Sequence, residues 1–340
     1  MKTVNCTWII SSALLAIGAA SSAQADEFYR GKSIDVIVAS APGGGYDLYA
    51  RLLARYMGRY LPGNPTFVVQ DMPGAGGVRA TQFLFNVARR DGTVIGIIAR
   101  EAPLIPLLEP DKGAQFNAAE FNWIGSPQQE LGLLIVNSRS PAQTLQELKE
   151  KAIAVSATGP GTAPSVFPRV LNNVFGTKFK VVDGYAGSQE ALLAVEKGEV
   201  DGHVSGGSSS GFRARIDPWI EKGQAKVLMQ LGFRKDAAYA QAPLALDLVQ
   251  NADDRQLLEL VFSPQLIGRP FLAPPGLPQE RVALLQASFD QTMHDTEFLA
   301  EAQKLQMEVN PVRGDDIKKL LQRVYAMPAG LIERAKKVVK

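Results

Sequence analysis

The sequence predicts an α/β protein of two lobes built on doubly wound sheets, and three observations lead to that class. Strand-like and helix-like segments alternate from residue 33 onward, as in parallel sheets covered by helices. The chain has 340 residues, more than one domain usually holds. Glycine-rich turns lead from strands into helices in both halves. This arrangement favours a ligand held between the lobes.

The first 25 residues are predicted to be a secretory signal peptide and not part of the fold. Lys2 precedes an apolar stretch over residues 8–20, and the "AQA" of residues 23–25 supplies a cleavage site after Ala25. The apolar stretch is too short for a membrane span, and no later segment approaches ~18 uninterrupted apolar residues. We therefore expect an exported chain.

The composition argues against several classes of function. Cys6, the single cysteine, is removed with the signal, so no thiolate nucleophile or cysteine metal ligand remains. His203 and His294 are the only histidines, which disfavours a multi-histidine metal site, and no cofactor is expected. Because 36 Lys and Arg nearly balance 34 Asp and Glu, no nucleic-acid partner is expected.

The first lobe is predicted to begin with three strands separated by two helices. The strands are "SIDVIVAS" (33–40), "TFVVQD" (66–71) and "GTVIGIIAR" (92–100), and the second helix is "VRATQFLFNVARR" (78–90). In the first helix, residues 46–61, the spacing predicts one apolar face made of Leu48, Leu52, Leu53, Tyr56 and Tyr60.

The second lobe repeats the alternation. Its predicted strands are residues 131–138, 153–159, 178–184, 199–207 and 225–232, and its helices are residues 144–152, 163–176 and 188–198. Thr144 and Glu147 have the spacing of a capping box.

The boundaries follow from a Pro-rich crossing, "LIGRPFLAPPGLP" (266–278), and a helical tail. We predict a discontinuous lobe 1 made of residues 26–126 plus 259–340, with lobe 2 inserted as residues 127–258.

Four glycine turns carry the functional prediction: "APGGGYD", "MPGAGG", "ATGPGTAP" and "DGYAGSQ". Each turn joins the carboxyl end of a strand to a helix N-terminus, where unpaired N–H groups and the helix dipole favour an anion. Glycine lets the backbone approach a ligand closely. One dipole contributes only ~0.3 to 1 kcal/mol, so several turns closing on one anion are expected.

At these residues the chain resembles the extracytoplasmic solute receptors of tripartite tricarboxylate transporters, the Bug or TctC-like family. "IDVIVASAPGGGYDLYARLLARYM", "VVQDMPGAGG", "VVDGYAGSQEALLAVEKGEVDG" and "FLAPPGLPQERVALLQ" carry the resemblance. It implies a periplasmic two-lobed binding protein of the type II-like, Venus flytrap class. Such a receptor captures a small carboxylate without catalysis, is expected to be a monomer, and delivers its ligand to a permease of one large and one small membrane subunit.

The resemblance also implies the ligand-binding residues. The two turns of lobe 1 would hold one carboxylate through backbone amides and water, and the lobe 2 turns would supply hydroxyl groups to the other end of the ligand. Carried over, these residues are Gly44, Gly45, Tyr46, Asp47, Ala75, Gly76, Thr158, Gly159, Thr162 and Ser205. Two features depart from the usual family pattern: Tyr46 stands where Ser or Thr is common, and the lead into the closing strand is longer.

Two charged residues near the first turn leave alternatives open. Asp47 could cap its helix, or it could accept hydrogen bonds from the ligand or water. Arg100 could bind a ligand carboxylate bidentately, or pair with Glu101 or another acid. Tyr46, Tyr185 and Phe167 lean towards an aromatic acid as the ligand.

Two rival functions match short motifs. "GGGYDL" partly imitates the dinucleotide motif, but Leu48 replaces its third glycine. "GSSSG" around Ser209 matches a hydrolase nucleophile motif, and Asp254 and His294 follow in hydrolase order. A hydrolase nucleophile of this kind needs a helix directly after it, and "FRARIDPW" is a poor helix start. The receptor is therefore favoured, and a secreted serine hydrolase is kept as the alternative.

Overall fold

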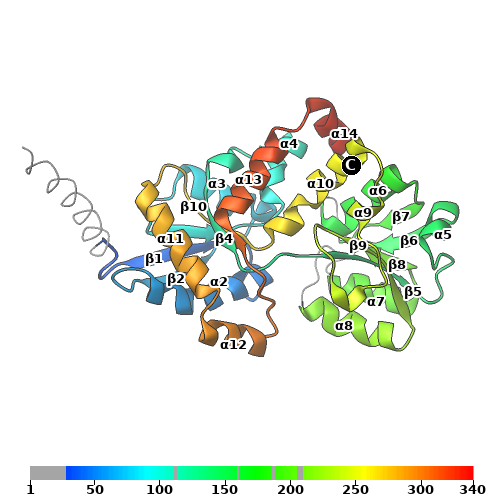
Figure 1. The fold of residues 1–340 in the computed structure, drawn as a ribbon, viewed down its shortest axis with the longest axis horizontal. Coiled ribbons are helices and arrows are strands. Elements are labelled where there is room, and N and C mark those ends of the chain that lie inside the picture. The colour runs from blue at the N-terminus through cyan, green and yellow to red at the C-terminus, as the bar shows by residue number, and fades with distance from the viewer. Residues whose placement is uncertain (1–27, 111–112, 159–160, 186–187, 205–209, 340) are drawn as a thin grey trace, which may run out of the picture.

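The structure is a computed structural model that describes residues 28–110, 113–158, 161–185, 188–204 and 210–339. The chain forms two lobes side by side, and each lobe surrounds one mixed β-sheet (Figure 1). The predicted two-lobed α/β class is therefore confirmed. In the described part of the chain, no helix combines the length and the apolar character that crossing a membrane requires.

The sheet of lobe 1 has six strands in the order β11-β4-β10-β3-β1-β2. Strands β1, β2 and β3 are parallel, whereas β10 runs antiparallel to β3 and β4, and β11 antiparallel to β4. The bounds are β1 (Ser33–Val38), β2 (Thr66–Asp71), β3 (Val94–Ile97), β4 (Asn122–Ser126), β10 (Phe271–Ala273) and β11 (Val312–Arg313).

Helices cover both faces of this sheet. Ile34, Val36 and Val38 alternate along β1 and are buried in one core with α2 and α11, while Ile37 faces the second core with α3 and α13. The helical elements of lobe 1 are α2 (Gly45–Tyr56), η1 (Met57–Tyr60), η2 (Ala75–Gly77), α3 (Val78–Asn86), η3 (Ala102–Leu104), α4 (Ile105–Leu108), η5 (Ala118–Glu120), α11 (Gln279–Thr292), α12 (Thr296–Lys304) and α13 (Gly314–Tyr325).

The predicted apolar face of α2 is right in part. Leu52, Leu53 and Tyr56 are buried, but Leu48 is 46% exposed. Tyr49, one residue along, takes the buried position, so the buried face is rotated from the predicted one. The Tyr49 hydroxyl donates to the carbonyl of Glu308 at 2.8 Å, which satisfies the polar end of the buried ring.

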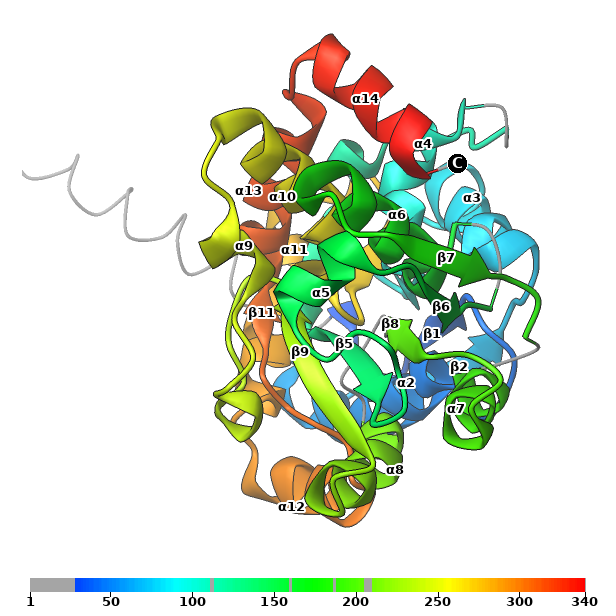
Figure 2. The ribbon, with the colours of Figure 1, turned by 90° about the vertical axis from the view of Figure 1, so that its right-hand side faces the viewer.

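The sheet of lobe 2 has five strands in the order β7-β6-β8-β5-β9, and Figure 2 looks onto this lobe. Its strands are β5 (Gly132–Asn137), β6 (Ile153–Ser156), β7 (Phe179–Val182), β8 (Gly202–Val204) and β9 (Ala225–Leu231). Strands β6, β7 and β8 are parallel, and β5 is antiparallel to β8 and β9. Its helical elements are α5 (Leu145–Glu150), α6 (Ala163–Phe175), α7 (Ser188–Lys197), α8 (Ser210–Glu221), η6 (Ala237–Tyr239) and α9 (Ala245–Leu248).

The predicted capping box at α5 forms with one change, because Glu147 accepts from the N–H of the residue before the N-cap and not from that of Thr144. The Thr144 side chain accepts from the N–H of Glu147, and Glu147 accepts from the N–H of Gln143. The start of α8 at Ser210 differs from the sequence-based expectation of a poor helix here. Arg213 and Arg215 stabilise it through ion pairs to Asp236 and Glu196, contacts that become available only in the folded lobe.

Two short segments cross between the lobes, residues 127–131 and residues 268–270, the latter after the long helix α10 (Ala252–Ile267). They touch: Gly268 has φ +64°, and a Cβ there would collide with the Gln128 carbonyl. The N–H of Glu130 also donates to the Gln265 carbonyl at 2.8 Å. Because the chain re-enters lobe 1 from the other lobe, β10 runs antiparallel to its neighbours.

The last helix, α14 (Ala329–Val339), lies at the top of Figure 1 and contacts α6 of lobe 2 as well as α10 and α4. Arg334 on α14 pairs with Asp254 at 2.5 Å. The C-terminal tail is therefore attached to both lobes.

Candidate functional site

The carboxyl ends of β1, β2 and β3 bring three loops to one edge of the lobe 1 sheet. The N–H of Ala39 donates to the Ile97 carbonyl at 3.0 Å, and the N–H of Met72 donates to the Val38 carbonyl at 2.8 Å. The loops that follow, residues 40–44, 73–77 and 99–101, are therefore neighbours. In α/β sheets this edge is where ligands bind.

The glycine loop after β1 leaves the N-terminus of α2 open. Gly43 has φ +79°, a left-handed conformation that side chains disfavour. Gly44 is the N-cap residue of α2, and no side chain caps it. The amides of the first turn thus keep the unsatisfied character and positive dipole end that attract an anion.

Asp47 lies under the glycine loop rather than on its surface. Only 2% of the residue is exposed, its Oδ2 accepts from the Gly43 N–H at 2.7 Å, and its Oδ1 lies 2.7 Å from the Nε of Arg51. Burial raises the pKa of Asp47, but the hydrogen bonds from Arg51 and Gly43 outweigh it, and the pKa is lowered. These contacts favour the role in which Asp47 holds its own loop.

The second loop contains a strained residue. Ala75 has φ +48°, and it is exposed at the start of η2 between Gly74, with φ +140°, and Gly77, with φ +93°. A left-handed alanine costs ~1 to 2 kcal/mol, and such strain concentrates at binding sites. The backbone of Gly76 lies inside the same turn.

Arg100 lies in the third loop and belongs to a buried ionic cluster. Its Nη1 lies 2.5 Å from Glu130 Oε2, and its Nε lies 2.9 Å from Glu101 Oε1. Burial by itself lowers the pKa of Arg100, but Glu101 and Glu130 outweigh that effect and raise it, so the guanidinium stays charged. The ion pair with Glu101 that the sequence left open is formed, and Glu130 is a further partner.

Tyr46 connects the glycine loop to this cluster. Its hydroxyl oxygen accepts from the Arg100 N–H at 3.1 Å, and the guanidinium carbon of Arg269 lies 4.7 Å from the centre of its ring. Burial raises the pKa of the Tyr46 phenol, which therefore keeps its proton at neutral pH. The aromatic ring thus lies between two arginines at the base of the loop.

The lobe 2 candidates lie on a different sheet. Thr158 follows β6 and donates to the hydroxyl of Thr162, the N-cap residue of α6, at 3.3 Å. Gly159 and Ser205 lie outside the described residues. The structure groups the lobe 1 candidates at one sheet edge and these two threonines at the corresponding edge of lobe 2.

The aromatic residues that favoured an aromatic ligand in the sequence differ in where they lie in the structure. Phe167 is wrong as a ligand wall: it is 2% exposed and packs edge-on against Phe262 with ring centres 4.9 Å apart, because its helix directs it into the core. Tyr185 is half-buried at the end of the β7 loop.

Sequence reasoning missed Arg269 and Glu130. Arg269 is the one charged residue in the crossing segment "LIGRPFLAPPGLP", and Glu130 directly precedes the apolar strand "LGLLIVN". A lone charge inside an apolar context is the signal that could have identified both residues.

The structure removes one argument against the serine hydrolase alternative and adds another. A helix does begin at Ser210, directly after Ser209 and within the motif, so the expectation of a poor helix start was wrong. However, Asp254 is bound to Asn251 and Arg334, and His294 lies exposed after α11 with its Nδ1 at the Asp290 carbonyl. Neither contact assembles a triad, and Ser209 lies outside the described residues.

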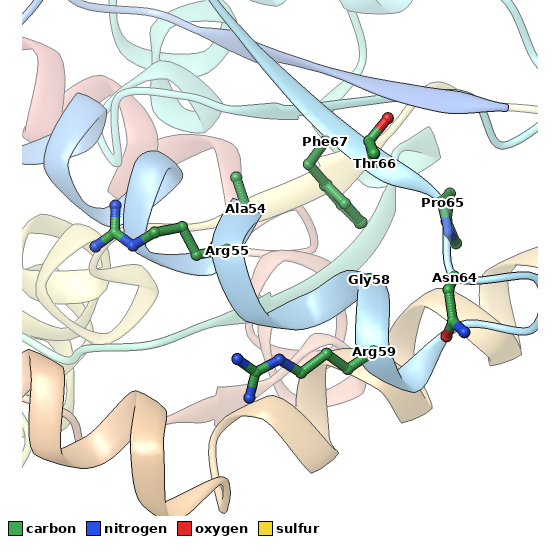
Figure 3. A pocket seen from close by; sticks show the side chains of 8 residues that line it. All are labelled: Ala54, Arg55, Gly58, Arg59, Asn64, Pro65, Thr66 and Phe67. Carbon is green, nitrogen blue, oxygen red and sulfur yellow. The ribbon is translucent and has the colours of Figure 1, made fainter. Parts of the chain in front are cut away.

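A hollow on the outer surface of lobe 1 lies away from the three loops (Figure 3). It lies beside η1 and the amino-terminal end of β2, whereas the loops follow the carboxyl ends of the strands. The guanidinium groups of Arg55 and Arg59 on its rim pair with Glu301 and Glu297 of α12. The residues that line it are Ala54, Arg55, Gly58, Arg59, Asn64, Pro65, Thr66 and Phe67.

Among the residues that the structure describes, no three His, Cys, Asp or Glu side chains gather as metal ligands. The hydrogen-bond donors at the three loops are amide N–H groups, a phenol and guanidinium groups, and the carboxylate of Glu101 is paired with Arg100. All of these donors are suited to an oxyanion.

Comparisons with known proteins agree with this architecture. A family model described as the tripartite tricarboxylate transporter family receptor matches residues 49–336. A curated protein of Agrobacterium vitis, "UPF0065 protein in the TAR-I ttuE-ttuC' intergenic region", is 27% identical over 191 residues, 53% of this chain. The match spans about half of that relative, 52% of its length.

Solved structures share the fold. A TctC solute-binding protein from Polaromonas superposes with a TM-score of 0.70 at 19% identity, covering 90% of this chain and 99% of that one. MatC from Rhodopseudomonas palustris with bound malate gives 0.60 at 20% identity, covering 91% and 99%. An R. palustris protein with adipate gives 0.61 at 15% identity, covering 91% and 97%.

Proposed function

The chain belongs to the tripartite tricarboxylate transporter receptor family, TctC, and on that premise we propose that it captures a small organic carboxylate between its lobes. The receptor would act in the periplasm after removal of residues 1–25, and would deliver its ligand to a permease of one large and one small membrane subunit. It binds as a monomer and performs no chemistry on the ligand.

One observation carries the proposal: the uncapped N-terminus of α2 lies at the sheet edge where the loop of the strained Ala75 and the loop of Arg100 also lie. A carboxylate placed there accepts from backbone amides of the first two loops and lies in a positive field. Micromolar binding requires about −8 kcal/mol, more than one helix terminus supplies. Several loops must therefore contribute.

The second lobe supplies the remaining contacts on closure. Thr158 and Thr162 present hydroxyl groups at the carboxyl end of β6. In the sequence, Gly159 follows Thr158 directly and Ser205 follows the last residue of β8. Hinge movement at residues 127–131 and 268–270 would bring this edge onto the ligand. The contact set on lobe 1 comprises Gly44, Gly45, Tyr46, Ala75 and Gly76, with Asp47 acting beneath the loop.

The ligand class is a small organic acid of one to three carboxylates. Acids are bound in two proteins of the same fold, malate in one and adipate in the other. Tyr46 gives the lobe 1 site an aromatic surface that would also accept an aromatic acid.

A thermal-shift screen with malate, adipate, citrate and benzoate tests the proposal. At 100 times its dissociation constant a ligand adds ~2.7 kcal/mol to the stability of the folded protein, which is a measurable rise in melting temperature. Glucose and magnesium chloride serve as controls without a carboxylate. A rise with a control alone, or nitrophenyl-ester turnover that Ser209→Ala abolishes, would contradict a carboxylate receptor.

A further inference from the structure

Arg269 places a guanidinium group against the first turn of α2. A Cβ added to Gly45 would lie 2.9 Å from Nη1 and 3.0 Å from both the guanidinium carbon and Nη2. The guanidinium also lies over two rings, 4.7 Å from the centre of Tyr46 and 5.6 Å from that of Tyr49. Gly45 therefore has a second reason to be glycine, because any side chain there would displace Arg269.

The hydrogen bonds of Arg269 leave one of its nitrogens available. Nη2 lies 3.0 Å from Glu130 Oε1, and Nε donates weakly to Gln128 Oε1 at 3.4 Å. Nη1 has no acceptor among the described residues, and it lies with the rest of the guanidinium group across the Cβ position of Gly45. A guanidinium has five donors, and one that is mostly buried ordinarily uses those that point into the protein.

The two carboxylates in the ionic cluster around Arg269 differ in their exposure to solvent. Glu130 is buried and is shared by two cations, since its other oxygen pairs with Arg100 at 2.5 Å. Glu101, the second acid near Arg100, is 37% exposed and is partly solvated. The formal charges of Arg100 and Arg269 are balanced by those of Glu130 and Glu101. The positive end of α2 adds an attraction for an anion that no side chain in this cluster cancels.

We propose that Arg269 is a specificity-determining ligand residue, whose Nη1 donates to the carboxylate held at the N-terminus of α2. Glu130 fixes the guanidinium from one side and the Tyr46 ring supports it from another, so the group is oriented before the ligand arrives. This assignment rests on the proposed function. It adds a charged partner to a site otherwise made of backbone amides, and it favours a carboxylate over a neutral amide of the same shape.

The test compares a carboxylate with its amide in wild type, Arg269→Gln and Arg269→Lys. The probe is the acid from malate, adipate, citrate and benzoate that stabilises the wild-type protein most, paired with the analogue in which one carboxylate is an amide. Affinities are measured by titration calorimetry. Arg269→Gln is expected to weaken acid binding about 10- to 100-fold, the usual loss for a charged hydrogen bond, and to change amide binding much less. Arg269→Lys retains the charge and should lose less.

Arg281→Gln is the matched control. Arg281 is also buried and also lies over two aromatic rings, 3.6 Å from the centre of Phe28 and 5.5 Å from that of Tyr29. It is near Gly92, at the amino end of β3, opposite the loops. Arg281→Gln should lower stability and leave acid affinity within about threefold.

The outcomes separate this proposal from the proposed function. If the wild-type protein binds none of the acids, the proposed function fails, and the role of Arg269 fails with it. If the wild type binds an acid and folded Arg269→Gln binds acid and amide with the same ratio as wild type, only the assignment of Arg269 is overturned. Should Arg269→Gln not fold, the acid-to-amide ratio of Arg269→Lys decides, and a ratio unchanged from wild type overturns it.

Discussion

Glu130 Oε2 lies 2.5 Å from Nη1 of Arg100, and this ion pair joins the first interlobe crossing to the loop after β3. Both groups are buried, with 2% of the Glu130 side chain and 13% of the Arg100 side chain exposed. The pair is therefore shielded from solvent and links the interlobe crossing to the candidate ligand loops.

Removing the charge of Glu130 should destabilise the protein strongly. Glu130→Gln leaves the guanidinium groups of Arg100 and Arg269 buried without their shared anion, and we expect a loss of about 3–5 kcal/mol in the free energy of unfolding. Urea denaturation measures it. Asp247→Asn is the control, because its pair with Lys235 is more than half exposed, at 52% and 54%, and should be worth less than about 1 kcal/mol. Equal, small losses would mean that the buried pair does not form.

A feature of this fold could be predicted from the sequence when the residues that determine it are close together in the chain. The glycine loops, the strands that precede them and the Thr144 cap are set by residues close in sequence, and the structure has them. The Arg269–Glu130 contact joins residues from two crossings, and no local pattern encodes which acid a lone arginine will meet. Helix α8 was missed although Arg213 and Asp217 have the i,i+4 spacing of a helical ion pair, and the further pairs of its arginines to Asp236 and Glu196 join segments that are apart in sequence.

Asp47 should affect stability more than affinity. Asp47→Asn weakens the contact with Arg51 and the hydrogen bond from Gly43, and a loss of about 1–3 kcal/mol is expected at pH 7. Because its carboxylate is engaged beneath the loop, the dissociation constant of the stabilising acid should change only a few-fold. A large loss of affinity with little loss of stability would instead assign Asp47 to the ligand.

The pH dependence of Asp47 has a defined sign. Its pKa is lowered in the folded state, so the stabilisation is present above the unfolded value near 3.8 and is lost as the pH falls through the folded value. Unfolding measured from pH 5 to pH 2 should therefore show a smaller decline for Asp47→Asn than for wild type. Asp253→Asn, an exposed carboxylate at the start of α10, is the comparison and should leave the decline nearly unchanged.

His203 should make the protein sensitive to mild acid. It is 1% exposed, its Nδ1 lies 2.9 Å from the Ser156 carbonyl, and burial lowers its pKa from 6.5 to about 4. An imidazole that is harder to protonate when folded contributes stability above pH 6.5, which is lost as the pH falls towards 4. The shift corresponds to about 3 kcal/mol.

The two histidines of the chain provide a matched pair for that measurement. Denaturation between pH 7 and pH 4 should show the loss in wild type and in His294→Gln, because His294 is exposed. His203→Gln should start less stable and decline less steeply. Equal slopes in all three proteins would show that His203 titrates normally.

Ala75→Gly should stabilise the protein while weakening ligand binding. Ala75 has φ +48°, and glycine adopts that conformation without the ~1 to 2 kcal/mol that a Cβ costs, although the more flexible unfolded chain offsets part of the gain. We expect a net gain of up to about 1 kcal/mol by urea denaturation.

Ala80→Gly is the matched control, because Ala80 is buried and helical in α3, and it should cost about 1 kcal/mol or more. A loose loop must be ordered by the ligand, so Ala75→Gly should bind the acid several-fold more weakly. A loss of stability equal to that of Ala80→Gly would show that Ala75 is not held in the left-handed conformation, and the strain at this loop would then not contribute to the site.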